Sequence, residues 1–439
     1  MYKVPPVEEQ IGIELYTSNT PGIGGALRRQ IEDFRVIEIT NREEGDKGKY
    51  TIVELTKHNW ETHHLIRDIS RILGISQKRI GFAGTKDKRA VTTQKISFYD
   101  VPEERIESIN LKDVELKVIG RSNRDIGLGD LTGNEFIITV REIDIDKDEL
   151  ESRMQETTDS IKEQGGVPNF FGIQRFGALR PITHVVGESI VRGDIEKAAI
   201  DYIAAAYPGE PEETREVREM VFNNRDYVEG LKAYPVQLRY ERAMMHHLVS
   251  KPEDFAGAFE TVPMNIRKMF VHAYQSYIYN TIICQRIEKG LPLNRAVVGD
   301  IVCFKNKEGL PDNSRIEQVT EDNIDGMNNL IKRKRAFVTA PLVGYDTQMA
   351  SGVPGEIERN VLEELDVPLE GFKVPSMDKM ASKGLRREIL LGVDPNYTIS
   401  EDEINAGKFS VTLDFSLPKG SYATTVLREY MKVEPSRMS

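Results

Sequence analysis

The chain has 439 residues, with 59 basic and 70 acidic side chains, so its formal net charge at pH 7 is −11. This length predicts two or three domains, with a core large enough to be stable without cross-links. A content of 29% charged and 39% hydrophobic residues excludes a wholly disordered chain. Two cysteines exclude a disulfide framework and fit a reducing compartment. The sequence contains no stretch of about 18 apolar residues and no signal-peptide layout, so we expect a soluble, cytoplasmic protein.

The first part of the chain is predicted to alternate short strands with one helix. Strands are expected where β-branched and aromatic residues are enriched, at 34–39, 50–55, 80–84, 94–99, 115–120 and 134–141. Apolar residues at helical spacing predict a helix over 65–73, and Gly74 follows them as a stop signal. This order indicates an α+β fold with an antiparallel or mixed sheet.

Helical patterns dominate the middle of the chain. A helix is predicted over 148–164, with Gly165 and Gly166 ending it. The stretch 184–289 is mostly helical, including a long helix over 265–290. Short strands are expected to return at 296–304 and 336–344.

The last fifty residues again resemble the first part. Strict alternation over 408–417 predicts a half-buried strand, and a helix is expected over 422–432. A strand of the first type at the end of the chain indicates one domain interrupted by another. We therefore predict a domain made of 1–167 and 391–439, with a second domain, 168–390, inserted into it.

Several familiar motifs are absent or wrongly spaced. The loop 81–86 lacks the spacing that holds a nucleotide phosphate, and the glycines of 127–133 miss the dinucleotide-binding spacing and precede a strand. None of the seven histidines lies in a zinc-ligand pattern, and no C-x-x-C occurs, so no metal site is expected.

The strongest local signal is a basic segment, residues 76–95. It carries one acid, Asp87, and a net charge of +5 in an acidic protein. Its basic residues are Lys78, Arg79, Lys86, Lys88, Arg89 and Lys95. A solvated charged turn explains the composition alone. The alternative is an ionised carboxylate set in a basic surface, which suits either an ion pair or covalent chemistry on a polyanion.

Two aromatic segments also allow two interpretations. VPNFFGIQRFG (167–177) is either a corner of the core or a surface on which unpaired bases stack. HAYQSYIYN (272–280) places three tyrosines on a helix, which is typical of a core with hydrogen-bonded hydroxyls.

Five segments together resemble one protein family. They resemble segments of the TruD family of tRNA pseudouridine synthases and follow one another in the family's order. In chain order, the five segments are EDFRVIEI, GFAGTKDKRAVTTQ, VPNFFGIQRFG, HAYQSYIYN and FSLPKGSYATTVLRE. They extend from about residue 28 to 430, which makes a chance match very unlikely.

The resemblance implies an α+β fold in which a pseudouridine-synthase catalytic domain, with a mixed and largely antiparallel sheet, is interrupted by a large α/β insertion domain. The insertion is 168–390, and the catalytic parts are 1–167 and 391–439. The implied enzyme is an isomerase, an intramolecular transferase that converts a uridine of tRNA, typically position 13, to pseudouridine. The resemblance implies no cofactor, tRNA as the partner, and no obligate protein partner.

The resemblance also implies roles for particular residues. The catalytic aspartate falls on Asp87, and the substrate-binding residues fall on Phe34, Asn169 and Tyr422. The basic residue before the D-F pair falls on Arg28, with Arg29 as the competing position. The charge of the basic segment adds RNA contacts, which we expect from Lys78, Arg79, Lys86, Lys88 and Arg89.

Two other functions remain open from the residues. One is a catalytically inactive RNA-binding protein of the same fold. The other is a nucleotide-dependent enzyme that binds its nucleotide with the loop 81–86. The residue spacing of this loop argues against that function. For the isomerase, a carboxylate can attack C1′ of the ribose or C6 of the base, or assist as a base.

Overall fold

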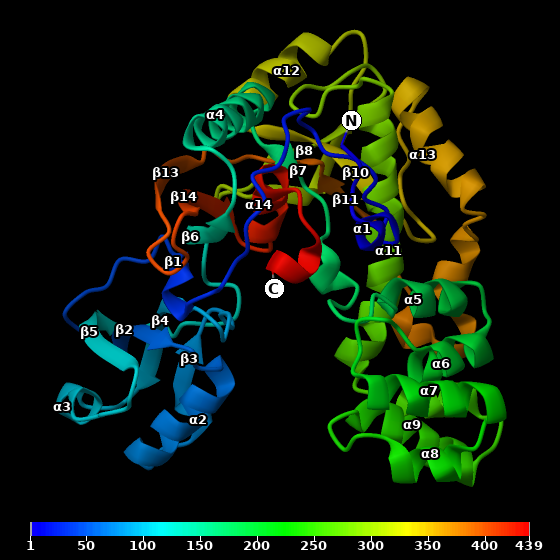
Figure 1. Ribbon diagram of the computed structural model, residues 1–439, viewed down its shortest axis with the longest axis horizontal. Coiled ribbons are helices and arrows are strands. Elements are labelled where there is room, and N and C mark those ends of the chain that lie inside the picture. The colour runs from blue at the N-terminus through cyan, green and yellow to red at the C-terminus, as the bar shows by residue number, and fades with distance from the viewer. Residues whose placement is uncertain (1, 439) are drawn as a thin grey trace. The chain divides into compact units, whose positions relative to one another are not determined.

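The computed structural model describes residues 2–438, which form two compact units (Figure 1). The sheet unit contains residues 18–167, residues 306–310 and the chain from Leu391 onward. The helical unit contains the chain up to Thr17 together with residues 168–305 and 311–390. The chain passes from one unit to the other within β7 (Val167–Pro168) and again within β12 (Leu390–Leu391).

The sheet unit is built on an eight-stranded sheet. Its order is β13-β14-β6-β1-β4-β2-β5, and β3 pairs with β4 beside this path. β1 and β4 run parallel, whereas the other pairings given for this sheet are antiparallel. The strands are β1 (Phe34–Ile39), β2 (Tyr50–His58), β3 (Ile80–Phe82), β4 (Val91–Tyr99), β5 (Val114–Ser122), β6 (Gly133–Ile143), β13 (Asn396–Glu401) and β14 (Phe409–Pro418). The predicted α+β fold with a mixed, largely antiparallel sheet is confirmed.

Helices of the sheet unit cover this sheet and form its cores. The helices are α2 (Thr62–Leu73), α3 (Glu103–Glu107), α4 (Lys147–Gln164) and α14 (Ala423–Met431), with 3₁₀ turns at Ile31–Asp33, Gln77–Arg79 and Pro435–Met438. One core joins the apolar side of α2 to β2 and β4. A second core joins α4 and α14 to β1, β6 and β14. The loop between β3 and β4 therefore starts and ends on well-packed strands.

The sequence signals at the ends of these elements have clear physical causes. β1 has the predicted bounds, and the predicted helices at α2 and α4 are confirmed. Gly74 and Gly165 end these helices in the left-handed conformation, which glycine adopts without steric cost. The alternation predicted for β14 holds from Val411 onward, and a register shift between Phe409 and Val411 changes which side chains are buried at its start.

The helical unit combines a helical array with a four-stranded antiparallel sheet of order β11-β10-β8-β9. Its long helix, α11, is yellow-green in Figure 1 and packs against α5 and α13. The helices are α1 (Pro6–Glu9), α5 (Thr183–Val191), α6 (Ile195–Ala204), α7 (Glu212–Asn224), α8 (Tyr227–Ala233), α9 (Arg239–Ser250), α10 (Phe255–Glu260), α11 (Met264–Glu288), α12 (Ile324–Lys332) and α13 (Gly352–Glu364), with 3₁₀ turns at Ile173–Arg175, Leu369–Lys373 and Pro375–Met380. The strands are β8 (Ile301–Lys305), β9 (Pro311–Gln318), β10 (Ala336–Leu342) and β11 (Leu385–Glu388).

The N-terminal segment belongs to the helical unit, although the sequence analysis grouped residues 1–167 together. Ile11, Ile13 and Leu15 are buried in the core of the helical unit. The side-chain amide of Asn280 in α11 donates a hydrogen bond to the carbonyl of Ile11 at 2.9 Å. Apolar burial and this hydrogen bond fix the segment against α11.

Neither a membrane-spanning helix nor a metal-binding cluster is found in the part of the chain that the structure describes. Among residues 2–438, no helix combines the length and apolar character of a membrane span. The same residues hold no group of three or more His, Cys, Asp or Glu side chains placed to bind a metal ion.

Candidate active site

The candidate site centres on the loop 83–90 between β3 and β4, which carries Asp87. Neighbouring elements hold the backbone of this loop at several points. Gln94 of β4 donates to the carbonyl of Gly84 at 3.3 Å. The Thr62 hydroxyl, at the start of α2, accepts from the Lys86 N–H at 3.1 Å. These contacts give an eight-residue connection without regular structure a defined conformation.

Arg28, from the chain before β1, meets Asp87 of this loop. A carboxylate oxygen of Asp87 lies 3.4 Å from a guanidinium nitrogen of Arg28, and the Asp87 side chain is 48% exposed. Arg28 also lies over the ring of Phe34, 4.1 Å from its centroid. The carboxylate is therefore open to solvent on one side and faces a cation that is itself held by an aromatic ring.

The structure distinguishes the two competing arginines. Arg28 faces Asp87, whereas Arg29 points to Glu142, with 2.7 Å between Nε and the carboxylate. Arg28 has a positive φ of 56°, a backbone conformation that side chains other than glycine seldom adopt. Arg89 donates a 2.8 Å hydrogen bond to the carbonyl of Arg28, which fixes this turn to the Asp87 loop.

Phe34 and Tyr422 differ in exposure. Phe34 is 3% exposed and packs edge-on against Phe136, so it supports Arg28 instead of offering an open ring face. Tyr422 is 40% exposed at the start of α14, which leaves its ring available for stacking. No contact in the described residues joins Tyr422 to Asp87.

Asn169 belongs to the helical unit, in the chain that follows β7. Its side-chain amide donates to the carbonyl of Glu388 at 2.9 Å and to the carboxylate of Glu388 at 3.1 Å. Its side-chain oxygen accepts from Arg387 at 3.1 Å. Burial raises the pKa of the Glu388 carboxyl, and the positive charge of Arg387 partly offsets this rise.

The two aromatic segments form part of the core of the helical unit. Phe170, Phe171 and Phe176 are all less than 9% exposed, so the core interpretation of 167–177 holds for them. Tyr279 is fully buried and donates its hydroxyl to the carbonyl of Glu388 at 2.6 Å. This matches the predicted core tyrosine with a hydrogen-bonded hydroxyl.

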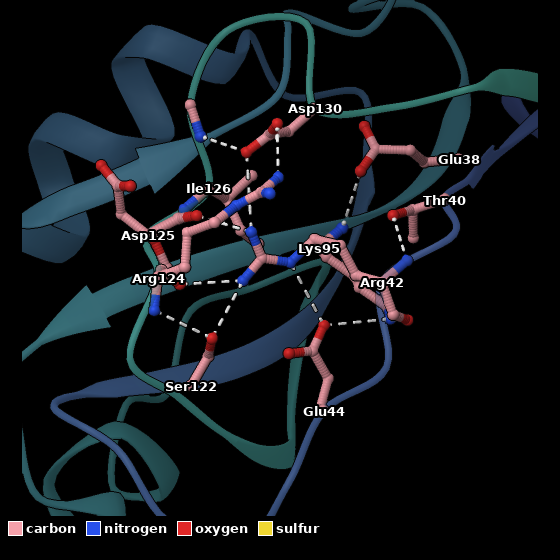
Figure 2. A network of polar contacts seen from close by, with 12 residues as sticks. Glu38, Thr40, Arg42, Glu44, Lys95, Ser122, Arg124, Asp125, Ile126 and Asp130 are labelled. Atoms are coloured by element: carbon pink, nitrogen blue, oxygen red, sulfur yellow. Dashed lines mark hydrogen bonds and ion pairs between the residues drawn. The ribbon is translucent and has the colours of Figure 1, made fainter. Parts of the chain in front are cut away.

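Two lysines of the basic segment are neutralised by nearby carboxylates. The Lys86 side chain is 6% exposed, and its Nζ lies 2.8 Å from a carboxylate oxygen of Glu38. Lys95 lies 3.3 Å from the carboxylate of Glu44, which also faces Arg42 at 3.5 Å (Figure 2). Lys86 thus ties the Asp87 loop to β1, and Lys95 ties β4 to the β1–β2 connection. Lysines neutralised in this way are not favoured for direct contact with phosphate.

The other basic side chains of the segment are more accessible. Lys78, Lys88 and Arg89 are exposed, and the ion pairs found in the described residues include neither Lys78 nor Lys88. Arg79 donates to the carbonyl of Tyr99 at 2.6 Å, so its guanidinium has a structural task. A cavity of about 230 Å³ lies beside this end of β4, lined by Tyr50, Lys78, Arg79, Gly81, Tyr99 and Asp125.

The sequence analysis missed Lys57 and Thr62, which also contact this loop. Lys57 lies in β2 and is fully buried, with its Nζ 2.8 Å from the carbonyl of Asp87. Thr62 begins α2 and contacts Lys86. In the sequence, Lys57 is one residue of a strand pattern and Thr62 is one residue at a helix start. Both patterns are common, and neither indicates that a side chain holds a loop far away in the chain.

This arrangement presents a carboxylate that is half exposed, faces a guanidinium and sits on a fixed backbone. Such a group is suited to nucleophilic or base chemistry, because a fixed position reduces the entropy lost on reaching the transition state.

Comparisons with known proteins identify the chemistry. Residues 10–430 match the family model described as tRNA pseudouridine synthase D (TruD). A Methanococcoides burtonii protein named "Probable tRNA pseudouridine synthase D" is 78% identical over 439 residues, 100% of both chains. A Halobacterium salinarum protein of the same name is 40% identical and covers 99% of each chain. The crystal structure of a TruD-type protein from Methanosarcina mazei matches with a TM-score of 0.94 at 61% identity, covering 100% of both chains.

Matches of this extent define the class of protein as an RNA-modifying isomerase of the pseudouridine synthase type. The chain belongs to the tRNA pseudouridine synthase D (TruD) family. The resemblance found in the five sequence segments is thereby confirmed.

Proposed function

We propose that this protein isomerises a uridine of tRNA to pseudouridine with Asp87 as its catalytic carboxylate. Position 13 is the uridine that the family resemblance implies. The observation that carries the proposal is the Asp87 carboxylate 3.4 Å from Arg28, on a loop held by β2, β4 and α2. The guanidinium favours the ionised form of the carboxylate and orients it.

The reaction breaks the bond between C1′ and N1, turns the base, and joins C1′ to C5. N1 gains a proton and C5 loses one, so no electrons are transferred. The Asp87 carboxylate either displaces N1 at C1′ and is displaced in turn by C5, or adds at C6 and is eliminated after C5 has bonded to C1′. Both routes need one ionised carboxylate beside the uridine. The target base must first leave its stack, which costs a few kcal/mol.

Other residues are proposed to bind the substrate. Tyr422, with its exposed ring, stacks on the extruded base, which is worth about 1–3 kcal/mol. Asn169 is proposed as a polar substrate contact, and Arg28 with Phe34 beneath it orients Asp87. Lys78, Lys88 and Arg89 are exposed cations that contact tRNA phosphates.

The two units are proposed to divide the work. The sheet unit, which contains Asp87, Arg28 and Tyr422, performs the chemistry. The inserted residues 168–390 recognise the shape of tRNA. The feature that supports this second role is a run of four exposed basic residues, Lys332 to Arg335, at the end of α12.

The test is single-turnover conversion of an unmodified tRNA transcript at saturating enzyme, with pseudouridine mapped by position. Asp87→Asn has nearly the same shape but lacks the charge and the nucleophile, so we expect conversion at background level with tRNA binding retained. Wild-type conversion by Asp87→Asn would refute the assignment of Asp87. Binding without conversion by the wild type would favour the alternative of an inactive RNA-binding protein.

A further inference from the structure

Lys57 is a fully buried lysine that has no carboxylate partner. Its residue exposure is 0%, and its Nζ donates to the carbonyl of Trp60 at 2.7 Å and to the carbonyl of Asp87 at 2.8 Å. In the described part of the chain, no ion pair within 4.0 Å includes Lys57. Lysine is almost never fully buried unless it is paired, so this position requires an explanation.

The surroundings of Lys57 confirm that its charge is costly. Burial lowers the pKa of Lys57 to about 8, while the charges of Asp87 and Glu61 raise it and the charge of Lys86 lowers it further. A methionine or leucine would fill the same volume without this cost. Only the two hydrogen bonds to carbonyl oxygens distinguish the lysine from an apolar side chain.

One of these carbonyls belongs to Asp87 itself. The other contacts to the loop involve its neighbours: Thr62 holds Lys86, and Gln94 holds Gly84. Lys57 therefore fixes the peptide unit directly attached to the residue that carries the carboxylate. A small displacement of a reacting group reduces the rate by a large factor, so this contact can affect the rate by fixing the position of the carboxylate.

We propose that Lys57 is a positioning residue for the isomerisation, whose ammonium group holds the Asp87 backbone so that the carboxylate faces Arg28. This inference rests on the proposed function of Asp87. Lys57 has no exposed atoms with which to contact tRNA, so its effect is on the chemical step and not on binding. A charged donor suits the task because charge-assisted hydrogen bonds are roughly twice as strong as neutral ones.

The sheet unit contains a matched control for this experiment. Lys432 is partly buried, and its Nζ donates to the carbonyls of Ser18 at 2.7 Å and Thr20 at 2.6 Å and to the Ser18 hydroxyl at 2.9 Å. Burial lowers its pKa to about 8 as well. Lys57→Met and Lys432→Met thus each remove an ammonium group that donates to two backbone carbonyls, but only the first of these changes affects a carbonyl of the catalytic loop.

The experiment measures single-turnover conversion, tRNA affinity and thermal unfolding for the full-length variants. Lys57→Met should reduce the conversion rate at saturating enzyme by about 10²-fold and leave tRNA affinity unchanged. Lys432→Met should lower the melting temperature by a similar amount and keep the wild-type rate. A wild-type rate in Lys57→Met, or an equal rate loss in both variants, would overturn the inference.

A pH profile keeps the inference falsifiable if Lys57→Met does not fold. The charged groups that act on Lys57 are Asp87, Glu61 and Lys86. As the pH rises through about 8, Lys57 loses its charge, so the wild-type rate should fall. In Lys57→Arg the guanidinium stays charged, and the fall should be absent. A wild-type rate that does not fall through this range would also overturn the inference.

The two proposals fail in different ways. If Asp87→Asn is inactive while Lys57→Met converts at the wild-type rate, only the role of Lys57 is refuted. If Asp87→Asn converts normally, the proposed function itself is refuted.

Discussion

Lys86 of the Asp87 loop and Glu38 of β1 form an ion pair, with 2.8 Å between Nζ and the carboxylate and side-chain exposures of 6% and 1%. Lys88, two residues further along the same loop, is exposed. Two lysines that look equivalent in the sequence therefore have different tasks. The first fastens the loop to β1, and the second presents a charge to solvent.

Lys88→Ala and Lys86→Met should accordingly have opposite signatures. Lys88→Ala should weaken tRNA binding and flatten the fall of log K with log salt by up to about 0.9, while stability stays unchanged. Lys86→Met leaves the buried Glu38 carboxylate without a cationic partner, while the Lys95 N–H still donates to it at 3.4 Å, so the unfolding free energy should fall by about 3–5 kcal/mol. Binding titrations at several salt concentrations and urea unfolding measure the two effects. An unchanged salt slope in Lys88→Ala would remove this residue from the tRNA interface.

Arg28→Met and Arg29→Met form a second matched pair. Arg28→Met removes the cation facing Asp87, so the single-turnover rate should fall by about 10²-fold or more. Arg29→Met removes a partly exposed ion pair with Glu142 that lies away from Asp87 and is worth about 1 kcal/mol, so its rate should match the wild type. Equal rates in the two variants would show that the contact between Arg28 and Asp87 has no part in the reaction.

The basic run at the end of α12 tests the recognition role of the helical unit. Lys332 and Arg333 are exposed, and changing both to Ala should weaken tRNA binding and flatten its salt dependence. The conversion rate at saturating enzyme should not change, because these residues are proposed to bind and not to react. Lys232→Ala is the control, since that lysine is already paired with Glu229. If both variants bind tRNA like the wild type, this run does not contact tRNA.

Acid stability should depend on Asp402, which joins the end of β13 to β6. Burial alone would raise the pKa of its carboxyl, but hydrogen bonds from the Glu142 N–H, Asn405 and Arg141 hold it down at about 2. The folded-state pKa thus lies below the unfolded value, so the stabilisation is present above about pH 4 and is lost as the pH falls toward 2.

Asp402→Asn should lower the unfolding free energy by about 2 kcal/mol at neutral pH, because a charged acceptor of several hydrogen bonds is lost. The difference from the wild type should shrink as the pH falls below 4. Urea unfolding of both proteins across this range measures it. A difference that stays constant down to the lowest pH would contradict the assigned titration.

Local patterns were sufficient to predict much of the fold. β1, α2, α4 and α14 follow from spacing and stop signals that depend on near neighbours in the chain. By contrast, β9 and β13 were not predicted. Neither strand contains a fully buried residue, so their strand conformation depends on pairing with β8 and β14.

For the candidate site, residue types and spacing were enough to predict the basic loop with its single acid and the five family segments around it. The folded chain was needed to show that Arg28 rather than Arg29 faces Asp87, that Lys86 is paired with Glu38, and that Lys57 holds the Asp87 backbone. Residue type and spacing specify local conformation and charge. Which charges neutralise each other depends on contacts between strands that lie far apart in the chain, and those contacts form only when the sheet is assembled.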